Sequence, residues 1–131
     1  MSAVRILPWV VHEAIEYAAG LFFVLAPFVL GFSEDPTAFP VFVGVGVVIL
    51  AVAVLSRGPA GVVGVLPTQV HAALDYVLAF FLIVAPFVFG FNDLPVARNA
   101  AIFLGVAHLV VSLVTAFPRE GARDGAASAQ T

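Results

Sequence analysis

Long apolar runs alternate with short polar breaks along the chain, and this pattern predicts four membrane-spanning helices. A helix of about 20 residues rises about 30 Å, which matches the hydrocarbon thickness of a bilayer. We expect the spans at residues 12–32, 38–56, 71–91 and 99–117. The second run is rich in β-branched residues, but inside a bilayer only a helix satisfies its own backbone groups, so a helix is expected there too.

Short polar segments separate the four runs. Acidic turns follow the first and third runs, at residues 33–36 and 92–95, and a connection rich in Gly, Pro and Val joins the second run to the third. The C-terminal segment 118–131 is polar and lacks apolar periodicity, so we expect it to be disordered. The sequence therefore predicts a single integral membrane domain over residues 1–131, of the all-α class.

The four runs form two copies of one pattern. Residues 7–57 align with residues 66–116 without a gap, at an offset of 59 positions. Each copy holds two spans, which is an even number, so both copies enter the membrane from the same side. We therefore expect two tandem helical hairpins related by a pseudo-two-fold axis along the membrane normal, as in transporters built from parallel repeats.

Composition supports a membrane protein and excludes several functions. Hydrophobic residues make up 63% of the chain and charged residues only 10%, whereas soluble domains carry about 25% charged residues. The five basic residues are scattered arginines, so there is no basic patch and nucleic acid is not an expected partner. Cysteine is absent, which excludes disulfides, thiolate metal sites and thiol redox chemistry. The lipid bilayer is the partner that this composition predicts.

The arginines predict an orientation. Four of them fall on one side of the expected bundle: Arg5, Arg57, Arg119 and Arg123. The two short turns on the other side hold only Arg98, together with three acidic residues. The positive-inside rule then predicts a multi-pass protein of the plasma membrane with both termini in the cytoplasm.

A proline motif closes the first and third runs. The triplets Ala26-Pro27-Phe28 and Ala85-Pro86-Phe87 are each followed, after two residues, by Gly-Phe. A repeated hairpin of this kind resembles the SPW-repeat family of small membrane proteins, whose hallmark is a Ser-Pro-Trp triplet and a Gly-Phe exit. Here Ala replaces Ser and Phe replaces Trp. The resemblance covers residues 12–56 and 71–115, and it implies the fold and a membrane location but no activity.

Pro27 and Pro86 each remove one backbone hydrogen bond inside an apolar helix. We expect each to be a structural kink that lets neighbouring helices splay and pack, which is a common use of proline in membrane helices. The alternative is a freed carbonyl group that faces a cavity and binds an ion or a substrate. No charged residue accompanies either proline inside the membrane, and this favours the kink.

Two histidine–carboxylate pairs lie near the starts of the first and third spans. His12 and Glu16 stand four residues apart, as do His71 and Asp75, so each pair shares one helix face. The pseudo-two-fold axis would bring the pairs together at the cytoplasmic end. One hypothesis is a site for a divalent metal such as zinc, manganese or iron, or for proton transfer. The other, favoured by the sequence, places these residues at headgroup depth, where water reaches them.

His108 lies near the middle of the fourth span, where the first repeat has Ile49. Its helix face also carries Gly105 and Ser112, so we expect this face to point into the bundle. A histidine there either hydrogen-bonds a neutral partner or serves as a proton relay. Helix rise places His108 about 10 Å deeper than His71, which argues against a bis-histidine haem site, and we expect no cofactor.

Other polar residues near these pairs receive structural interpretations. Glu13 points about 100° away from the face of His12 and aligns with Ala72, so we exclude it from the site. Trp9 and the two tyrosines are interpreted as interfacial anchors. No serine has a histidine and an acid nearby in the sequence, so nucleophilic catalysis has little support.

Three functional hypotheses follow from the sequence. The leading one is a non-enzymatic membrane protein that packs with copies of itself or with a partner protein. The second is a small ion-, metal- or proton-handling membrane protein that uses the two pairs and His108. The third is a subunit of a membrane enzyme. The sequence identifies no catalytic residue, and we expect no enzymatic activity of the chain itself.

Overall fold

A computed structural model describes residues 5–118 of the chain, so nearly all of the tail segment 118–131 lies outside the described residues. Four helices follow one another: α1 (Trp9–Val29), α2 (Ala38–Leu55), α3 (Thr68–Val88) and α4 (Pro95–Val114). Each is long and apolar enough to cross a membrane, by length and composition. The all-α fold class with four spans is confirmed.

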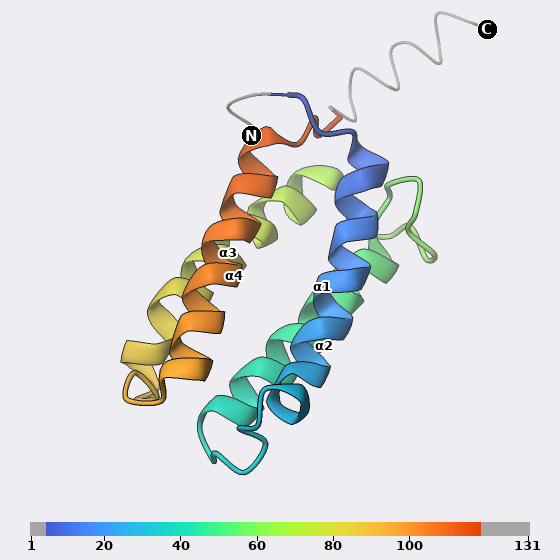
Figure 1. The fold of residues 1–131 in the computed structure, drawn as a ribbon. Coiled ribbons are helices and arrows are strands. Elements are labelled where there is room, and N and C mark those ends of the chain that lie inside the picture. Colours follow the sequence, from blue (N-terminus) through green and yellow to red (C-terminus); the bar gives the residue numbers. More distant parts are fainter. Residues whose placement is uncertain (1–4, 119–131) are drawn as a thin grey trace, which may run out of the picture.

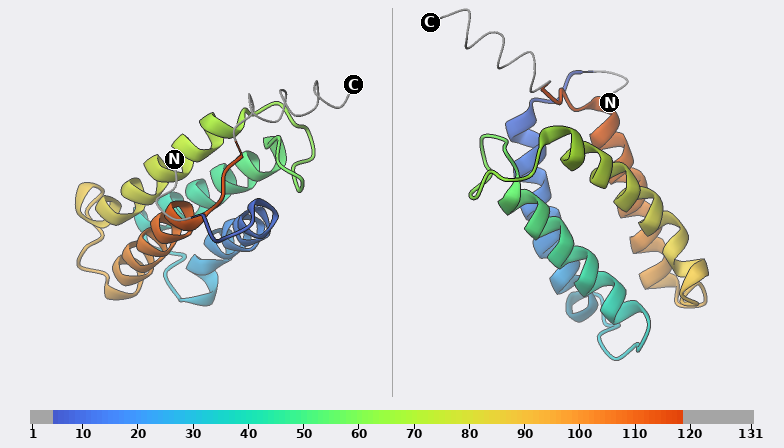
Figure 2. Two further views of the ribbon diagram at one scale, coloured as in Figure 1. Left: turned by 90° about the horizontal axis from the view of Figure 1, so that it is seen from above. Right: turned by 180° about the vertical axis from the view of Figure 1, so that it is seen from behind.

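The helices pair as two hairpins. α1 packs along α2 and α3 packs along α4, whereas contacts between the two pairs are few. The two short turns lie at one end of the molecule, and the described chain ends lie at the other (Figure 1). Seen from above, α2 and α3 lie on one side and α1 and α4 on the other (Figure 2). Both first helices therefore run in the same direction, as two parallel repeats require.

Short backbone pairings join the hairpins at the end that holds the chain termini. The N–H group of Leu7, just before α1, donates to the carbonyl of Val114 at the end of α4, at 2.9 Å. The connection between the hairpins repeats this bond 59 positions later, where Leu66 donates to the carbonyl of Leu55 at 2.8 Å. The start of each first helix is thus tied to the end of the second helix in the opposite hairpin.

α1 and α3 begin three residues earlier than the hydropathy pattern predicts, and α4 begins four residues earlier. Pro8 and Pro67 are the N-cap residues of α1 and α3, with ψ of 144° and 142°, so each helix starts immediately after its proline. Pro95 occupies the first turn of α4, where its missing N–H is not needed. Hydropathy places the apolar core of a span but does not locate its start. The shift adds three helical residues before His12.

The repeated proline motif forms the C-terminal end of α1. Gly31 has a φ of 81°, and the N–H group of Phe32 donates to the carbonyl of Pro27 at 2.8 Å. This is the Schellman arrangement, in which a left-handed glycine reverses the chain. Phe32 then packs against Phe42, with ring centroids 4.8 Å apart. α3 ends in the same way, with the equivalent bond at 2.9 Å. The prolines lie in the last helical turn, and the kink stays a prediction.

Small residues allow the helices of the first hairpin to approach closely. A Cβ atom added to Gly46 of α2 would lie 2.7 Å from Val24 Cγ2 and 2.8 Å from the carbonyl oxygen of Gly20. Both contacts are shorter than packed atoms tolerate, so the two glycines set the separation of α1 and α2. A phenylalanine-rich core fills the space between the hairpins nearer the turns, and it includes Phe23 and Phe42.

Candidate metal centre

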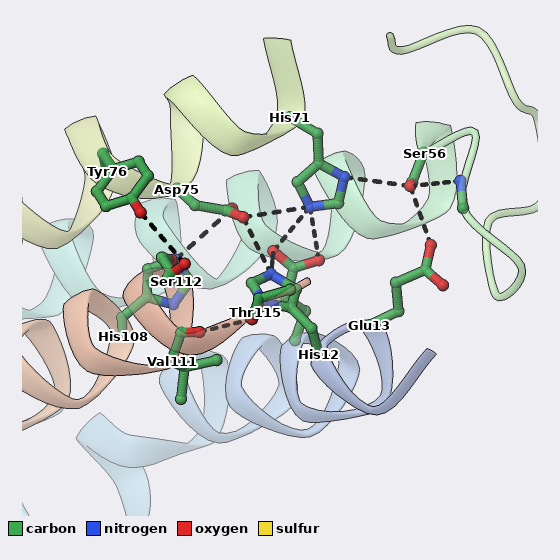
Figure 3. Close-up of polar contacts among 12 residues, drawn as sticks. His12, Glu13, Ser56, His71, Asp75, Tyr76, His108, Val111, Ser112 and Thr115 are labelled. Carbon is green, nitrogen blue, oxygen red and sulfur yellow. Dashed lines mark hydrogen bonds and ion pairs between the residues drawn. The ribbon is translucent and has the colours of Figure 1, made fainter. Parts of the chain in front are cut away.

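The two histidine–carboxylate pairs meet inside the bundle near the starts of α1 and α3 (Figure 3). One donor atom from each of His12, Glu16, His71 and Asp75 lies within 4.8 Å of the others. None of the four residues is more than 2% exposed. The prediction that water reaches them is therefore wrong, because the crossing segments at this end of the bundle cover the site.

Each imidazole lies closer to the carboxylate of the opposite hairpin than to its own. His12 Nε2 is 3.0 Å from Asp75 Oδ2 and 3.3 Å from Glu16 Oε1. His71 Nε2 is 2.9 Å from Glu16 Oε2 and 3.5 Å from Asp75 Oδ2. These contacts join α1 to α3. The site therefore links the two hairpins, which make few other helix–helix contacts with each other.

A hydroxyl group fixes the ring of His12 from the other side. His12 Nδ1 lies 2.7 Å from Thr115 Oγ1. The Thr115 hydroxyl donates its own proton to the carbonyl of Val111 at 2.5 Å, so its oxygen is left to accept from His12. Nδ1 of His12 therefore carries a hydrogen, and Nε2 is the nitrogen that faces the carboxylates.

A second hydroxyl group fixes His71 from the first hairpin. His71 Nδ1 lies 3.1 Å from Ser56 Oγ, and the Ser56 hydroxyl donates to Glu13 Oε1 at 3.0 Å. Because Ser56 has given its only proton to Glu13, the hydrogen in the contact with His71 belongs to Nδ1. Ser56 and Thr115 are 59 positions apart, so the two rings are held by equivalent residues of opposite repeats.

This arrangement requires positive charge between the rings and the carboxylates. In a neutral ring with hydrogen on Nδ1, Nε2 is a bare lone pair, and both Nε2 atoms lie 3.0 Å or less from a carboxylate oxygen. Two lone pairs at that distance repel each other. A proton in each contact, held by the ring or by the carboxyl group, removes the repulsion, and so does one divalent cation shared by the four donors. In both cases the four groups reach zero net charge.

The four separations between ring nitrogens and carboxylate oxygens match those expected around a tetrahedral metal ion. Bonds of about 2.0–2.1 Å around zinc place neighbouring donors about 3.3–3.4 Å apart. The closest contacts between ring nitrogens and carboxylates here run from 2.9 to 3.5 Å. Metal-binding histidines usually donate their other N–H to a nearby oxygen, as both rings do here. Two imidazoles and two carboxylates suit zinc, manganese or iron.

Glu13 belongs to the surroundings of this site, although its helix face predicted that it would lie outside. Its side chain is fully buried, and its carboxylate accepts hydrogen bonds from the Ser56 hydroxyl and, at 2.8 Å, from the N–H of Ala60. Glu13 does point away from the face of His12. The helix face alone gave no sign that the connection after α2 would fold against it. The sequence signal that could have pointed to these surroundings is the hydroxyl that both repeats carry at the equivalent position, Ser56 and Thr115.

Two aromatic side chains cover the site toward the chain ends. The ring centroid of Trp9 lies 4.7 Å from that of His71 and 5.2 Å from that of His12. The ring centroid of Phe117 lies 5.1 Å from that of Trp9 and 5.1 Å from that of His12. Trp9 is only 7% exposed, so its interpretation as an interfacial anchor is wrong. Both rings separate the polar centre from the surface at this end.

His108 approaches the same site from α4. Its Nε2 lies 3.6 Å from Asp75 Oδ1, and its ring centroid lies 6.5 Å from that of His12. The ring of His108 therefore lies at most 6.5 Å from the depth of His12, whereas helix rise predicted about 10 Å relative to His71. The backbone pairing of Leu7 with Thr115 brings the start of α1 level with the end of α4, which reduces the difference in depth.

Asp75 also borders an apolar groove between α2 and α3. The groove has a volume of about 770 Å³ and is lined mainly by valine, leucine, isoleucine and phenylalanine side chains, with Gly44 in the wall formed by α2. Asp75 is the one ionisable residue of its lining. A cation that approached from this side would have to cross apolar surface, which is costly. The groove suits a hydrocarbon chain or another helix better than a hydrated ion.

Four apolar helices in two like-oriented hairpins, joined by a buried polar centre, define a small multi-pass membrane protein built from a tandem repeat. The family model of the SPW repeat domain matches residues 8–115. The chain therefore belongs to the SPW repeat family, and the resemblance carried by the two proline triplets is confirmed. Neither a curated protein nor a solved structure matches the chain.

Proposed function

We propose that this protein binds a divalent transition-metal ion between its two hairpins. The observation that carries the proposal is the orientation of the two imidazoles: hydroxyl groups hold both Nδ1 hydrogens, and both Nε2 atoms face carboxylates. Of the three hypotheses drawn from the sequence, this geometry supports metal handling best. The proposed ligands are His12, Glu16, His71 and Asp75.

A shared cation accounts for the contacts better than two added protons. Each Nε2 lies within 3.5 Å of both carboxylates, so the four donors surround one point. One ion at that point contacts all four donors at once, whereas the proton on a ring serves mainly one acceptor. Two protonated rings would also repel each other, because the centroids of His12 and His71 are only 5.9 Å apart.

The test is the metal content of the full-length protein. Protein purified in detergent is loaded with Zn²⁺ or Mn²⁺, freed of unbound ion by gel filtration and measured by mass spectrometry of the metal. We expect at least one equivalent in the wild type and a large loss in Glu16→Gln, which keeps the shape of the side chain but removes its charge. Glu34→Gln, in the exposed turn after α1, is the matched control and should bind like the wild type. Wild-type protein that retains no ion would overturn the proposal.

We also propose a packing role, as the second candidate. The supporting observation is Gly44, which lines the apolar groove and has no atom within 4 Å of an added Cβ. A small residue on an open helix face allows the backbone of another helix to approach, from a second copy or a partner protein. Light scattering in detergent should then show a defined oligomer that Gly44→Leu dissociates. A monomeric wild type would count against self-association. Neither candidate assigns a chemical reaction to the chain.

We propose further that the protein lies in the plasma membrane with both termini in the cytoplasm, which the arginine distribution supports. The chain has no native cysteine, so single cysteines can report the orientation. A membrane-impermeant maleimide should label Glu34→Cys in intact cells and Arg57→Cys only after the cells are permeabilised. The opposite labelling pattern would refute this orientation.

A further inference from the structure

Two buried polar atoms of α4 have no hydrogen-bond partner within residues 5–118: His108 Nε2 and Ser112 Oγ. His108 is 9% exposed and Ser112 is fully buried. The two residues are one helical turn apart on the same face of α4. Buried polar atoms are nearly always bonded, so exceptions of this kind indicate a bound ion or water.

Asp75 presents its two carboxylate oxygens to different groups. Oδ2 faces His12 and His71, whereas Oδ1 faces Nε2 of His108. The distance of 3.6 Å from Oδ1 to His108 Nε2 is too long for a hydrogen bond. If both atoms bonded one ion at about 2.1 Å, the oxygen–ion–nitrogen angle would be about 118°, which lies in the range of metal coordination.

The equivalent positions of the first repeat show that the fold does not need polar residues here. Ile49 aligns with His108 and lies in the hydrophobic core, and Ala53 aligns with Ser112 and is fully buried. The first repeat thus packs the same positions with hydrocarbon. The polar pair on α4 therefore breaks the symmetry of the two repeats, and it does so beside Asp75 and not beside Glu16.

We propose that Asp75 bridges two cation positions. The first is the four-residue centre, and the second is formed by Asp75 Oδ1, His108 Nε2 and Ser112 Oγ. The inference rests on the proposed function, because the second position shares Asp75 with the first. Carboxylates bridge the ions of two-metal sites, which stand about 3.5–4 Å apart. Three protein donors leave at least one coordination position of such an ion to water or a small oxygen-donor ligand. The donor set takes a divalent ion that accepts both nitrogen and oxygen donors.

The experiment compares the wild type with the double variant His108→Ile/Ser112→Ala, which resembles the first repeat and should therefore fold. Both full-length proteins are loaded with Mn²⁺ in detergent, and circular dichroism checks their helicity. We expect two equivalents in the wild type and one in the double variant. Electron paramagnetic resonance should show a spin-coupled manganese pair in the wild type and an isolated Mn²⁺ signal in the variant.

The outcomes separate the two proposals. A wild type that holds one ion, which Glu16→Gln removes, would overturn the second position and leave the proposed function standing. Two ions in both proteins would place the second ion away from His108 and also overturn the inference. A wild type that holds none would overturn both proposals. If the double variant does not fold, the presence or absence of the coupled manganese signal in the wild type still decides the question.

Discussion

Replacing Gly46 with alanine tests whether the glycine contact sets the separation of α1 and α2. The added Cβ would lie 2.7 Å from Val24 Cγ2, 2.8 Å from the Gly20 carbonyl oxygen and 2.9 Å from the Val24 backbone nitrogen, whereas ordinary contacts begin near 3.4 Å. Two of these atoms belong to the backbone and cannot rotate away, so the helices must separate. Overpacking of this kind costs about 1–3 kcal/mol. Alanine regains up to about 1 kcal/mol of helix propensity. With that gain subtracted in full, we expect a net destabilisation of up to about 2 kcal/mol.

Gly44→Ala provides the matched control. Gly44 lies two residues away on the same helix, and a Cβ added there meets nothing within 4 Å. Within a single protomer its replacement should therefore be neutral or stabilising by up to about 1 kcal/mol. Equilibrium unfolding in mixed micelles, followed by far-ultraviolet circular dichroism, measures both variants. If Gly46→Ala proves as stable as Gly44→Ala, the close contact between α1 and α2 does not set the hairpin geometry.

Two further predictions concern the proposed metal centre. Ser56→Ala removes the hydroxyl that orients His71, so Zn²⁺ affinity should fall about 10–100-fold in competition with a chromophoric chelator. Ser56→Thr, which carries the hydroxyl of the second repeat, should retain the affinity, and equal affinity in both variants would contradict the orienting role. Removal of the ion with a chelator should lower the melting temperature of the wild type. The reason is that bound metal stabilises the folded state, by about 2.7 kcal/mol when the free metal concentration is 100 times Kd. The melting temperature of Glu16→Gln should not respond, and a chelator shift equal to that of the wild type would argue against Glu16 as a ligand.

The repeat alignment predicted much of this structure from the sequence. It placed His12 opposite His71 and Glu16 opposite Asp75, and residues four apart on a helix share a face. Two hairpins in the same orientation then bring equivalent faces together around one axis. The convergence of these four side chains follows from those two facts, and the sequence contains both.

The burial of the site could not be predicted in the same way. It depends on how non-helical segments cross the end of the bundle, where Trp9 folds over the rings and the connection after α2 closes around Glu13. Helical periodicity describes a face but does not identify the segment that covers it. Helix rise likewise misjudged the depth of His108, because it does not fix the register between helices from different hairpins.

The crossed pairing of the ligands has a consequence for how such a centre could originate. One repeat alone supplies an imidazole from His12, a carboxylate from Glu16 and an orienting hydroxyl from Ser56. Two separate copies of that repeat, inserted in the same direction, would complete the same centre across a symmetric homodimer. Gene duplication and fusion make that association intramolecular, so it no longer depends on the concentration of the protein in the membrane. Fusion also lets the two halves differ, as they do at His108 and its counterpart Ile49.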